Sequence, residues 1–209
     1  DVAIIGAGYT GLWTAYYLKQ AMPSLDVLVI EKDFAGYGAS GRNGGWLTGG
    51  FAWNHKRYLE TSSEQAVRAM VEAMNGTVDE VIRVAGAEGI DADIKRTEEL
   101  VVATKPAQVG RMRAEVAHRR HWGEEGRVFE MTADLAERIR IPGALGAMVV
   151  TDVARVQPAK LVRGLAKAVE RLGVRIVEGT TVTAFEKGLV TTDHGQVRAS
   201  VILRCTEGF

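Results

Sequence analysis

The first eleven residues constrain the fold of this chain more than any other segment. A short apolar run, residues 2–5, leads directly into a turn with the pattern G-x-G-x-x-G, and a helical pattern follows at once. The glycines of this turn are Gly6, Gly8 and Gly11. In a strand–turn–helix unit, the first glycine allows a tight turn and the second lets the backbone approach a pyrophosphate, while the third lets the helix pack closely on the strand. The segment therefore predicts a dinucleotide-binding β-α-β unit.

A carboxylate stands where such a unit needs one. The second apolar run, residues 27–30, ends in Glu31, twenty residues after Gly11. A carboxylate at this position accepts hydrogen bonds from ribose hydroxyls in dinucleotide-binding folds. The N–H groups of the first helical turn face the phosphates, where the helix dipole favours negative charge. We therefore favour a dinucleotide site over a plain β-α-β turn with an incidental glutamate.

Composition limits the classes of protein that fit this chain. Its 209 residues suffice for one large domain or two small ones. The 26 basic and 26 acidic residues give a net charge of zero, which argues against nucleic acid as the main partner. No apolar run approaches the roughly 20 residues of a membrane span. Cys205 is the only cysteine, so no intrachain disulfide can form. We expect a cytoplasmic protein, with peripheral membrane association as the alternative.

A second glycine-rich segment follows Glu31. Residues 36–45 combine glycines with Ser40, Arg42 and Asn43. Small residues let a loop pack against a flat ligand, and the polar side chains supply hydrogen bonds and a positive charge. A nicotinamide cofactor does not need such a loop directly after the second strand, whereas a bulkier cofactor lying there does. An ordinary glycine-rich surface loop is the alternative interpretation.

With these motifs, the chain resembles the FAD-dependent D-amino-acid oxidase family. The motifs that carry the resemblance are Gly6-x-Gly8-x-x-Gly11 with Ala15, Glu31-Lys32, and Gly38-Ala39-Ser40-Gly41-Arg42-Asn43-Gly44-Gly45. Within the family, the loop is most similar to the bacterial gamma-glutamylputrescine oxidoreductase-like amine oxidoreductases. Two later segments are also similar, residues 178–182 and residues 205–208, although Cys205 replaces an alanine and Glu207 is an extra residue. Members of the family run to about twice this length, so we expect an N-terminal fragment of a longer chain.

The resemblance implies a noncovalently bound FAD and a set of residues that hold it. These cofactor-binding residues are Gly6, Gly8, Gly11, Glu31, Lys32, Ser40, Gly41, Arg42, Asn43, Gly44, Gly45 and Val182. The three glycines of the first turn would line the pyrophosphate, and Glu31 would hold the adenosine ribose. Residues 40–45 would contact the phosphates, the ribityl chain and the edge of the ring system, and Val182 would contact the adenine.

The resemblance also implies a reaction. A neutral amine or amino acid delivers a hydride from its α-carbon to the flavin, and the imine hydrolyses to an aldehyde or keto product. The electrons then pass to oxygen or to a carrier. Because the flavin carries the chemistry, no catalytic side chain is required, and we identify none. Two alternatives stay open, an NAD(P)-linked dehydrogenase and a non-catalytic FAD-binding subunit.

The order of the remaining elements predicts an α/β fold with a doubly wound sheet interrupted by another layer. The resemblance implies that this sheet is a Rossmann-like FAD-binding sheet, interrupted by part of an α+β substrate domain. We assign residues 1–90 and 151–209 to the FAD-binding domain and residues 91–150 to the insert. Ser62 and Gln65 have the spacing of a capping box. The expected helices cover residues 62–87, 106–121, 132–138 and 158–172, and the expected later strands cover residues 99–103, 144–150 and four short runs within 174–204.

Several aromatic and histidine residues are weaker candidates. Trp46 and Phe51 follow the glycine-rich loop, and they either wall the substrate cavity or anchor the loop in the core. His55 lies in no motif for covalent flavin attachment. His118 and His121 have a spacing that can bind a metal, but the two flanking arginines repel a cation. We therefore expect no metal site.

Overall fold

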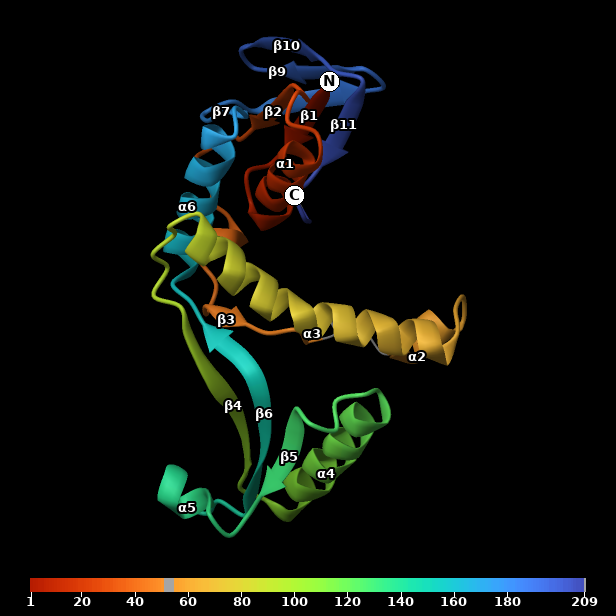
Figure 1. The fold of residues 1–209 in the computed structure, drawn as a ribbon, viewed down its shortest axis with the longest axis vertical. Coiled ribbons are helices and arrows are strands. Elements are labelled where there is room, and N and C mark those ends of the chain that lie inside the picture. Colours follow the sequence, from red (N-terminus) through yellow and green to blue (C-terminus); the bar gives the residue numbers. More distant parts are fainter. Residues whose placement is uncertain (51–54, 209) are drawn as a thin grey trace. The chain divides into compact units, whose positions relative to one another are not determined.

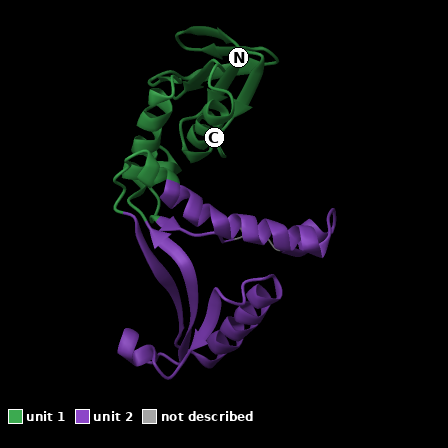
Figure 2. Ribbon diagram, viewed as in Figure 1, with its two compact units in different colours: residues 1–45, 84–93, 156–209 green, residues 46–83, 94–155 purple. Residues whose placement is uncertain are grey.

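The computed structural model describes residues 1–50 and 55–208. The chain forms two compact units, each of which is assembled from separate stretches of sequence (Figures 1 and 2). The first unit comprises residues 1–45, 84–93 and 156–209, and the second comprises residues 46–83 and 94–155. The chain therefore leaves the first unit and returns to it twice, whereas the sequence predicted a single insert over residues 91–150.

The first unit is built on a four-stranded parallel sheet with the order β11-β1-β2-β7. The bounds of these strands are β1 Val2–Ile5, β2 Val27–Ile30, β7 Arg175–Val177 and β11 Val201–Arg204. All four residues of β1 are buried, because this central strand is covered on both faces. A continuous apolar run, rather than an alternating one, is what such a strand needs.

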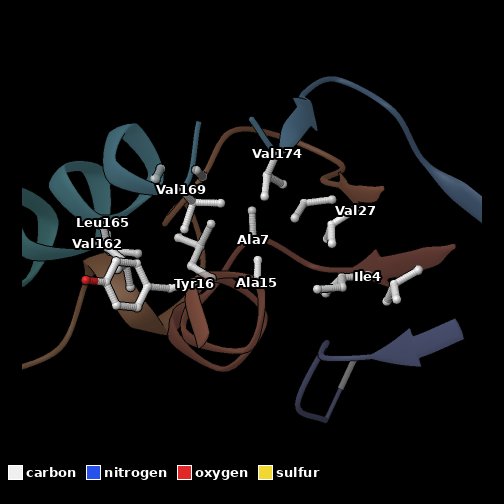
Figure 3. Close-up of a cluster of buried hydrophobic side chains, with 14 of the residues drawn as sticks. Ile4, Ala7, Ala15, Tyr16, Val27, Val162, Leu165, Val169 and Val174 are labelled. Carbon is white, nitrogen blue, oxygen red and sulfur yellow. The ribbon is translucent and has the colours of Figure 1, made fainter. Parts of the chain in front are cut away.

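Helices cover one face of the parallel sheet. They are α1 Tyr9–Ala21, α6 Pro158–Arg171 and the C-terminal end of α3 Glu64–Ala87. Figure 3 shows Ala15 and Tyr16 of α1 and Leu165 and Val169 of α6 gathered against strand residues, including Ile4. Burial of apolar side chains of this size stabilises a fold by about 1.5–3 kcal/mol each, so this cluster holds α1 in place.

A small antiparallel sheet packs against the other face of the parallel sheet. Its order is β10-β9-β8, with the bounds β8 Val182–Glu186, β9 Leu189–Thr192 and β10 Gly195–Arg198. Val190 of β9 is fully buried, and it clusters with Ala3 and Ile5 of β1 and Ile30 of β2. Residues 174–204 therefore contain five strands, where the sequence predicted four. The turns at the predicted glycines are present, and a further break at residues 199–200 divides the last predicted run into β10 and β11.

The second unit is a mixed α+β structure around the long strand β6 Gly146–Arg155. Antiparallel partners of β6 are β3 Trp46–Leu47, β4 Lys95–Ala103 and β5 Val128–Met131. The helices of this unit are α2 His55–Leu59, most of α3, α4 Pro106–His121 and α5 Leu135–Arg138. The sequence predicted only part of β4 and β6 and did not predict β5, whose four residues carry too weak an alternation to be recognised.

The limits of the two units differ from the expected domain limits. Residues 46–83 belong with the second unit, because Val67 and Val71 on the apolar face of α3 pack against Trp122. The N-terminus of α3 also differs in detail. The Ser63 hydroxyl accepts a hydrogen bond from the Ala66 N–H at 3.2 Å, so Ser63 caps the helix instead of Ser62. Within the described residues, no helix combines the length and the apolar character needed to cross a bilayer.

Candidate functional site

The glycine-rich turn closes around the carboxyl end of β1. Gly6 has a φ of +104°, which only glycine adopts without strain, and its N–H donates to the Ile30 carbonyl at 2.8 Å. A Cβ on Gly6 would lie 2.6 Å from the Cys205 carbonyl oxygen. Gly8 occupies the N-cap position of α1 and provides no side-chain cap. The N-terminus of α1 therefore opens toward the end of the sheet.

Glu31 is held in place by the turn that it faces. One carboxylate oxygen accepts from the Ala7 N–H at 2.8 Å, and the other accepts from the Asp33 N–H at 3.0 Å. A carboxylate has about four acceptor positions, so both oxygens keep capacity for a ligand hydroxyl. This geometry places a negative acceptor next to the turn, as the spacing of the sequence predicts.

The glycine-rich loop folds back onto α1. The Ser40 hydroxyl accepts from the Tyr9 N–H at 2.9 Å, and Ser40 lies in the short 3-10 helix η1, Ala39–Gly41. The Arg42 guanidinium lies over the Tyr37 ring, 4.7 Å from the ring centre. Such a cation–π contact restrains a long side chain near an aromatic surface. The loop therefore presents a hydroxyl and a positive charge close to the N-terminus of α1.

Tyr9 joins this loop region to α6. Its hydroxyl donates to the Pro158 carbonyl at 3.0 Å. Burial raises the pKa of Tyr9 from 10 to about 12, so the phenol stays protonated and keeps this hydrogen bond well above neutral pH. The contact holds the first residue of α1 to the first residue of α6.

The segment between β7 and β8 also lies beside Glu31, next to the glycine-rich turn and the loop described above. The Gly179 N–H donates to the Asp33 carbonyl at 2.8 Å, and the Thr180 N–H donates to the Glu31 carbonyl at 2.9 Å. The Glu178 carboxylate accepts from the Ala35 N–H at 2.8 Å. These contacts join residues about 145 positions apart, and they hold the segment beside the carboxyl end of β2.

These walls surround a cavity of about 760 Å³ that lies entirely within the first unit. Its volume lies within the range of small-molecule and cofactor sites. The predicted site residues that line it are Gly6, Gly8, Glu31, Lys32, Ser40, Arg42 and Val182. The lining residues that sequence reasoning did not select include Tyr9, Thr10, Asp33, Tyr37, Thr181, Phe185, Arg204 and Thr206.

Five predicted site residues are not among those that line the cavity. They are Gly11, Gly41, Asn43, Gly44 and Gly45. Gly11 and Gly41 allow close packing, since a Cβ on either would overlap a backbone carbonyl oxygen, that of Gly6 or Gly36 respectively. The Asn43 amide bonds within its own loop, where it donates to the Ala39 and Ser40 carbonyls. In this structure, these residues shape the loop and the turn behind the lining.

The weaker candidates lie elsewhere. Trp46 is 74% exposed in β3 of the second unit, so it is not a core anchor there, and Phe51 lies outside the described residues. His55 is buried in the second unit, where its ring stacks on Trp122 and its Nδ1 lies 3.1 Å from Nε2 of His118. Within the described part of the chain, no group of three or more His, Cys, Asp or Glu residues could hold a metal ion.

Fold and site together define a dinucleotide-binding α/β protein. A parallel sheet, a glycine turn before a helix N-terminus and a carboxylate at the end of the next strand form the dinucleotide-binding arrangement. A family model described as FAD dependent oxidoreductase, DAO, matches residues 1–209, and the chain belongs to this family. The resemblance found in the motifs is thereby confirmed, and so is FAD as the cofactor on which the family depends.

Curated relatives agree with this membership. Gamma-glutamylputrescine oxidoreductase of Escherichia coli is 28% identical over 207 residues, which cover 97% of this chain and 48% of that protein. A probable oxidoreductase, OrdL, of Rhizobium meliloti is 31% identical over 215 residues, covering 100% of this chain and 49% of that protein. The chain therefore spans about half the length of the curated relatives that it matches.

Solved structures show the same fold. Glycine oxidase from Geobacillus kaustophilus has a TM-score of 0.80 at 22% identity, over 98% of this chain and 54% of that chain. The L-amino acid deaminase from Proteus myxofaciens has a TM-score of 0.77 at 19% identity, over 98% of this chain and 44% of that chain. The predicted α/β class, with its interrupted Rossmann-like sheet, is confirmed by this likeness.

The residues present fit the adenosine and pyrophosphate parts of FAD. A Cβ on Gly8 would lie 2.9 Å from the Ser40 hydroxyl, so the missing side chain keeps the space at the helix N-terminus open. The carboxylate of Glu31 lies in the same cavity, together with the cationic side chains of Lys32 and Arg42. An acceptor for ribose hydroxyls and donors for phosphates are the groups that a dinucleotide requires.

Proposed function

We propose that this chain supplies the cofactor-binding part of a flavoenzyme that oxidises the C–N bond of an amine or amino acid. The observation that carries the proposal is the cavity where the N-terminus of α1, the Glu31 carboxylate and the glycine-rich loop meet. The substrate class is supported by similar proteins, whose names include gamma-glutamylputrescine oxidoreductase, glycine oxidase and L-amino acid deaminase. The oxidised product would hydrolyse to an aldehyde or keto compound, with oxygen or a carrier taking the electrons.

When bound, FAD would supply the hydride acceptor for the carbon next to the amine nitrogen. The residues of this chain would bind and orient the cofactor. The N–H groups at the start of α1, beside Gly8, would face the pyrophosphate, where a helix N-terminus stabilises an anion by about 0.3–1 kcal/mol or more. The Glu31 carboxylate would accept ribose hydroxyl hydrogens, and the Arg42 guanidinium would offset phosphate charge. Val182 would contact the adenine.

The two compact units would have different roles in the enzyme. We assign cofactor binding to the first unit, since the whole cavity lies in it, and part of a substrate domain to the second. Lys32, Ser40 and residues 41–45 would complete the cofactor site, either by contact or by shaping the loop. A cytoplasmic location and noncovalent cofactor binding belong to the same proposal.

The visible absorption spectrum of the purified full-length protein tests this function. We expect the two absorption bands of an oxidised flavin, and we expect denaturation to release free FAD. Anaerobic addition of amines and amino acids should bleach the spectrum when a substrate is present, and peroxide formation would identify oxygen as the acceptor. A flavin that no amine or amino acid reduces would favour a non-catalytic FAD-binding subunit. A colourless protein that takes up no added FAD would contradict the proposal.

Replacing Glu31 by alanine should weaken FAD binding by about 1–3 kcal/mol, the usual contribution of hydrogen bonds to a charged group. The loss has two causes, because Glu31 would contact the ribose and it also accepts the N–H groups of Ala7 and Asp33. Titration of the apoprotein with FAD, followed by flavin fluorescence, measures the change. The Glu31→Gln variant keeps one acceptor oxygen and should lose less.

Asp26 offers a matched control for Glu31. It precedes the opposite end of β2, and its carboxylate lies 3.4 Å from the Arg175 guanidinium, outside the cavity. The Asp26→Ala variant should therefore bind FAD with unchanged affinity. If Glu31→Ala binds FAD as tightly as this control, Glu31 takes no part in cofactor binding.

A further inference from the structure

The turn between β9 and β10 is joined to the wall of the cavity by a reciprocal pair of hydrogen bonds. The Asp193 carboxylate accepts from the Thr181 N–H at 2.9 Å. The Asp193 N–H in return donates to the Thr181 carbonyl at 3.0 Å. Thr181 lines the cavity, whereas Asp193 is not among the lining residues. Asp193 therefore contacts the wall from behind.

The same turn contacts the wall at a second point. The His194 ring nitrogen Nε2 lies 3.3 Å from the Gly179 carbonyl oxygen. The turn itself is braced by Thr192, whose hydroxyl accepts from the His194 N–H at 3.1 Å and donates to the Gly195 carbonyl at 3.0 Å. Local bonds of this kind give a turn one preferred conformation. The turn is therefore a firm support for the segment that it contacts.

The supported segment is held on its other side by the end of β2. The Gly179 and Thr180 N–H groups donate to the carbonyls of Asp33 and Glu31. Residues 180–182 thus lie between β2 and the turn, and all three line the cavity beside Glu31. If Glu31 holds the adenosine ribose, the base attached to that ribose lies against this segment.

We propose that Asp193 is a positioning residue for the adenosine end of the dinucleotide site, acting through Thr181 and Val182. This inference rests on the proposed function. Without the Asp193 carboxylate, the Thr181 N–H loses its acceptor. Residues 181 and 182 are then no longer fixed in the position that contacts the adenine base. A wall that must be ordered by the ligand binds more weakly than one already in place, because the ordering cost is subtracted from the binding free energy.

The test compares the affinity of Asp193 variants for ADP, which carries the adenosine end without the flavin, and for FAD. For the Asp193→Ala variant of the full-length protein, we expect about tenfold weaker binding of both ligands, the effect of one charge-assisted hydrogen bond. The Asp193→Asn variant keeps the Oδ1 acceptor and should restore most of the affinity. Calorimetry of the apoprotein gives both affinities, and thermal unfolding reports the stability of each variant.

Val197→Ala is the matched control for general weakening of the hairpin. Val197 lies on β10, where it pairs with Val190 of β9 and packs against the buried cluster below the small sheet, a different set of contacts from those of the Thr181–Asp193 pair. We expect it to lower the melting temperature at least as much as Asp193→Ala while leaving ADP affinity near that of the wild type. Equal losses of affinity in the two variants would overturn a specific role for Asp193.

The remaining outcomes separate this inference from the proposed function. If the wild-type protein binds neither ADP nor FAD, the assignment of the cavity as a dinucleotide site is contradicted, and so is the proposed role of Asp193. If the wild type binds both ligands and Asp193→Ala binds them equally well, the positioning role alone is overturned. An Asp193→Asn variant as weak as Asp193→Ala would also contradict it, since the acceptor oxygen would then not be what holds the wall.

Discussion

The Gly8→Val variant should lose FAD binding by more than about 100-fold, or about 2.7 kcal/mol, while most of the fold remains. Gly8 has φ −84° and ψ −174°, an extended conformation that valine adopts readily, so the backbone is not strained. A Cβ there would lie 2.9 Å from the Ser40 hydroxyl, and the added methyl groups would fill the approach to the N-terminus of α1. Titration of the apoprotein with FAD and thermal unfolding measure the two effects separately.

Ser40 offers the control that separates two causes of this loss. The Ser40 hydroxyl accepts from the Tyr9 N–H, and its displacement alone removes a helix cap, which costs about 1 kcal/mol of stability. In the Gly8→Val/Ser40→Ala double variant the clash with the hydroxyl is gone, but the valine still occupies the space for the pyrophosphate. We therefore expect no recovery of FAD binding. Full recovery would show that Gly8 acts only through Ser40, and wild-type affinity in Gly8→Val would exclude a pyrophosphate at this turn.

The first unit was predictable where local sequence decides the structure. The apolar runs before Gly6 and Glu31 form the expected parallel strands, and Pro158 begins α6 as expected. These features depend on propensity and spacing within a few residues. The glycines of the turn were also found from their spacing, although the atoms that leave no room for a Cβ at Gly6 and Gly8 belong to the distant residues Cys205 and Ser40.

The walls of the cavity were harder to predict because they depend on contacts between distant residues. Ser40 meets Tyr9 across 31 positions, and Glu178 meets Ala35 across 143 positions. No periodicity encodes such pairs. Val182 was named through the resemblance to the family, whereas its neighbour Thr181 was not, although both line the cavity. Thr181 lay in the family-like segment 178–182, but nothing in the sequence indicated that it would contact Asp193 twelve positions later.

In the second unit, too, contacts between distant residues could not be predicted from the sequence. The apolar face of α3 was visible in sequence, but the surface that it covers was not, because Trp122 lies about 50 positions further along the chain. The expected domain limit at residue 90 followed the end of that helix. The limits of the compact units follow the packing of Val67 and Val71, which is why most of α3 belongs with the later residues.

The Gly11→Ala variant should destabilise the first unit by more than about 2 kcal/mol, as overpacking of a tight contact does. A Cβ on Gly11 would overlap the Gly6 carbonyl oxygen and lie 3.2 Å from a methyl group of Ile4, and the oxygen belongs to backbone that cannot rotate away. Helix α1 would have to move off β1, so FAD affinity should fall with stability.

Gly86→Ala is the matched control, since Gly86 is also helical and lies in the first unit, and a Cβ there meets nothing within 4 Å. Alanine should leave stability unchanged there or raise it by up to about 1 kcal/mol, because glycine weakens a helix. Denaturant unfolding of both variants measures the difference, and equal stability of Gly11→Ala and wild type would show that α1 does not pack on β1 as closely as the structure describes.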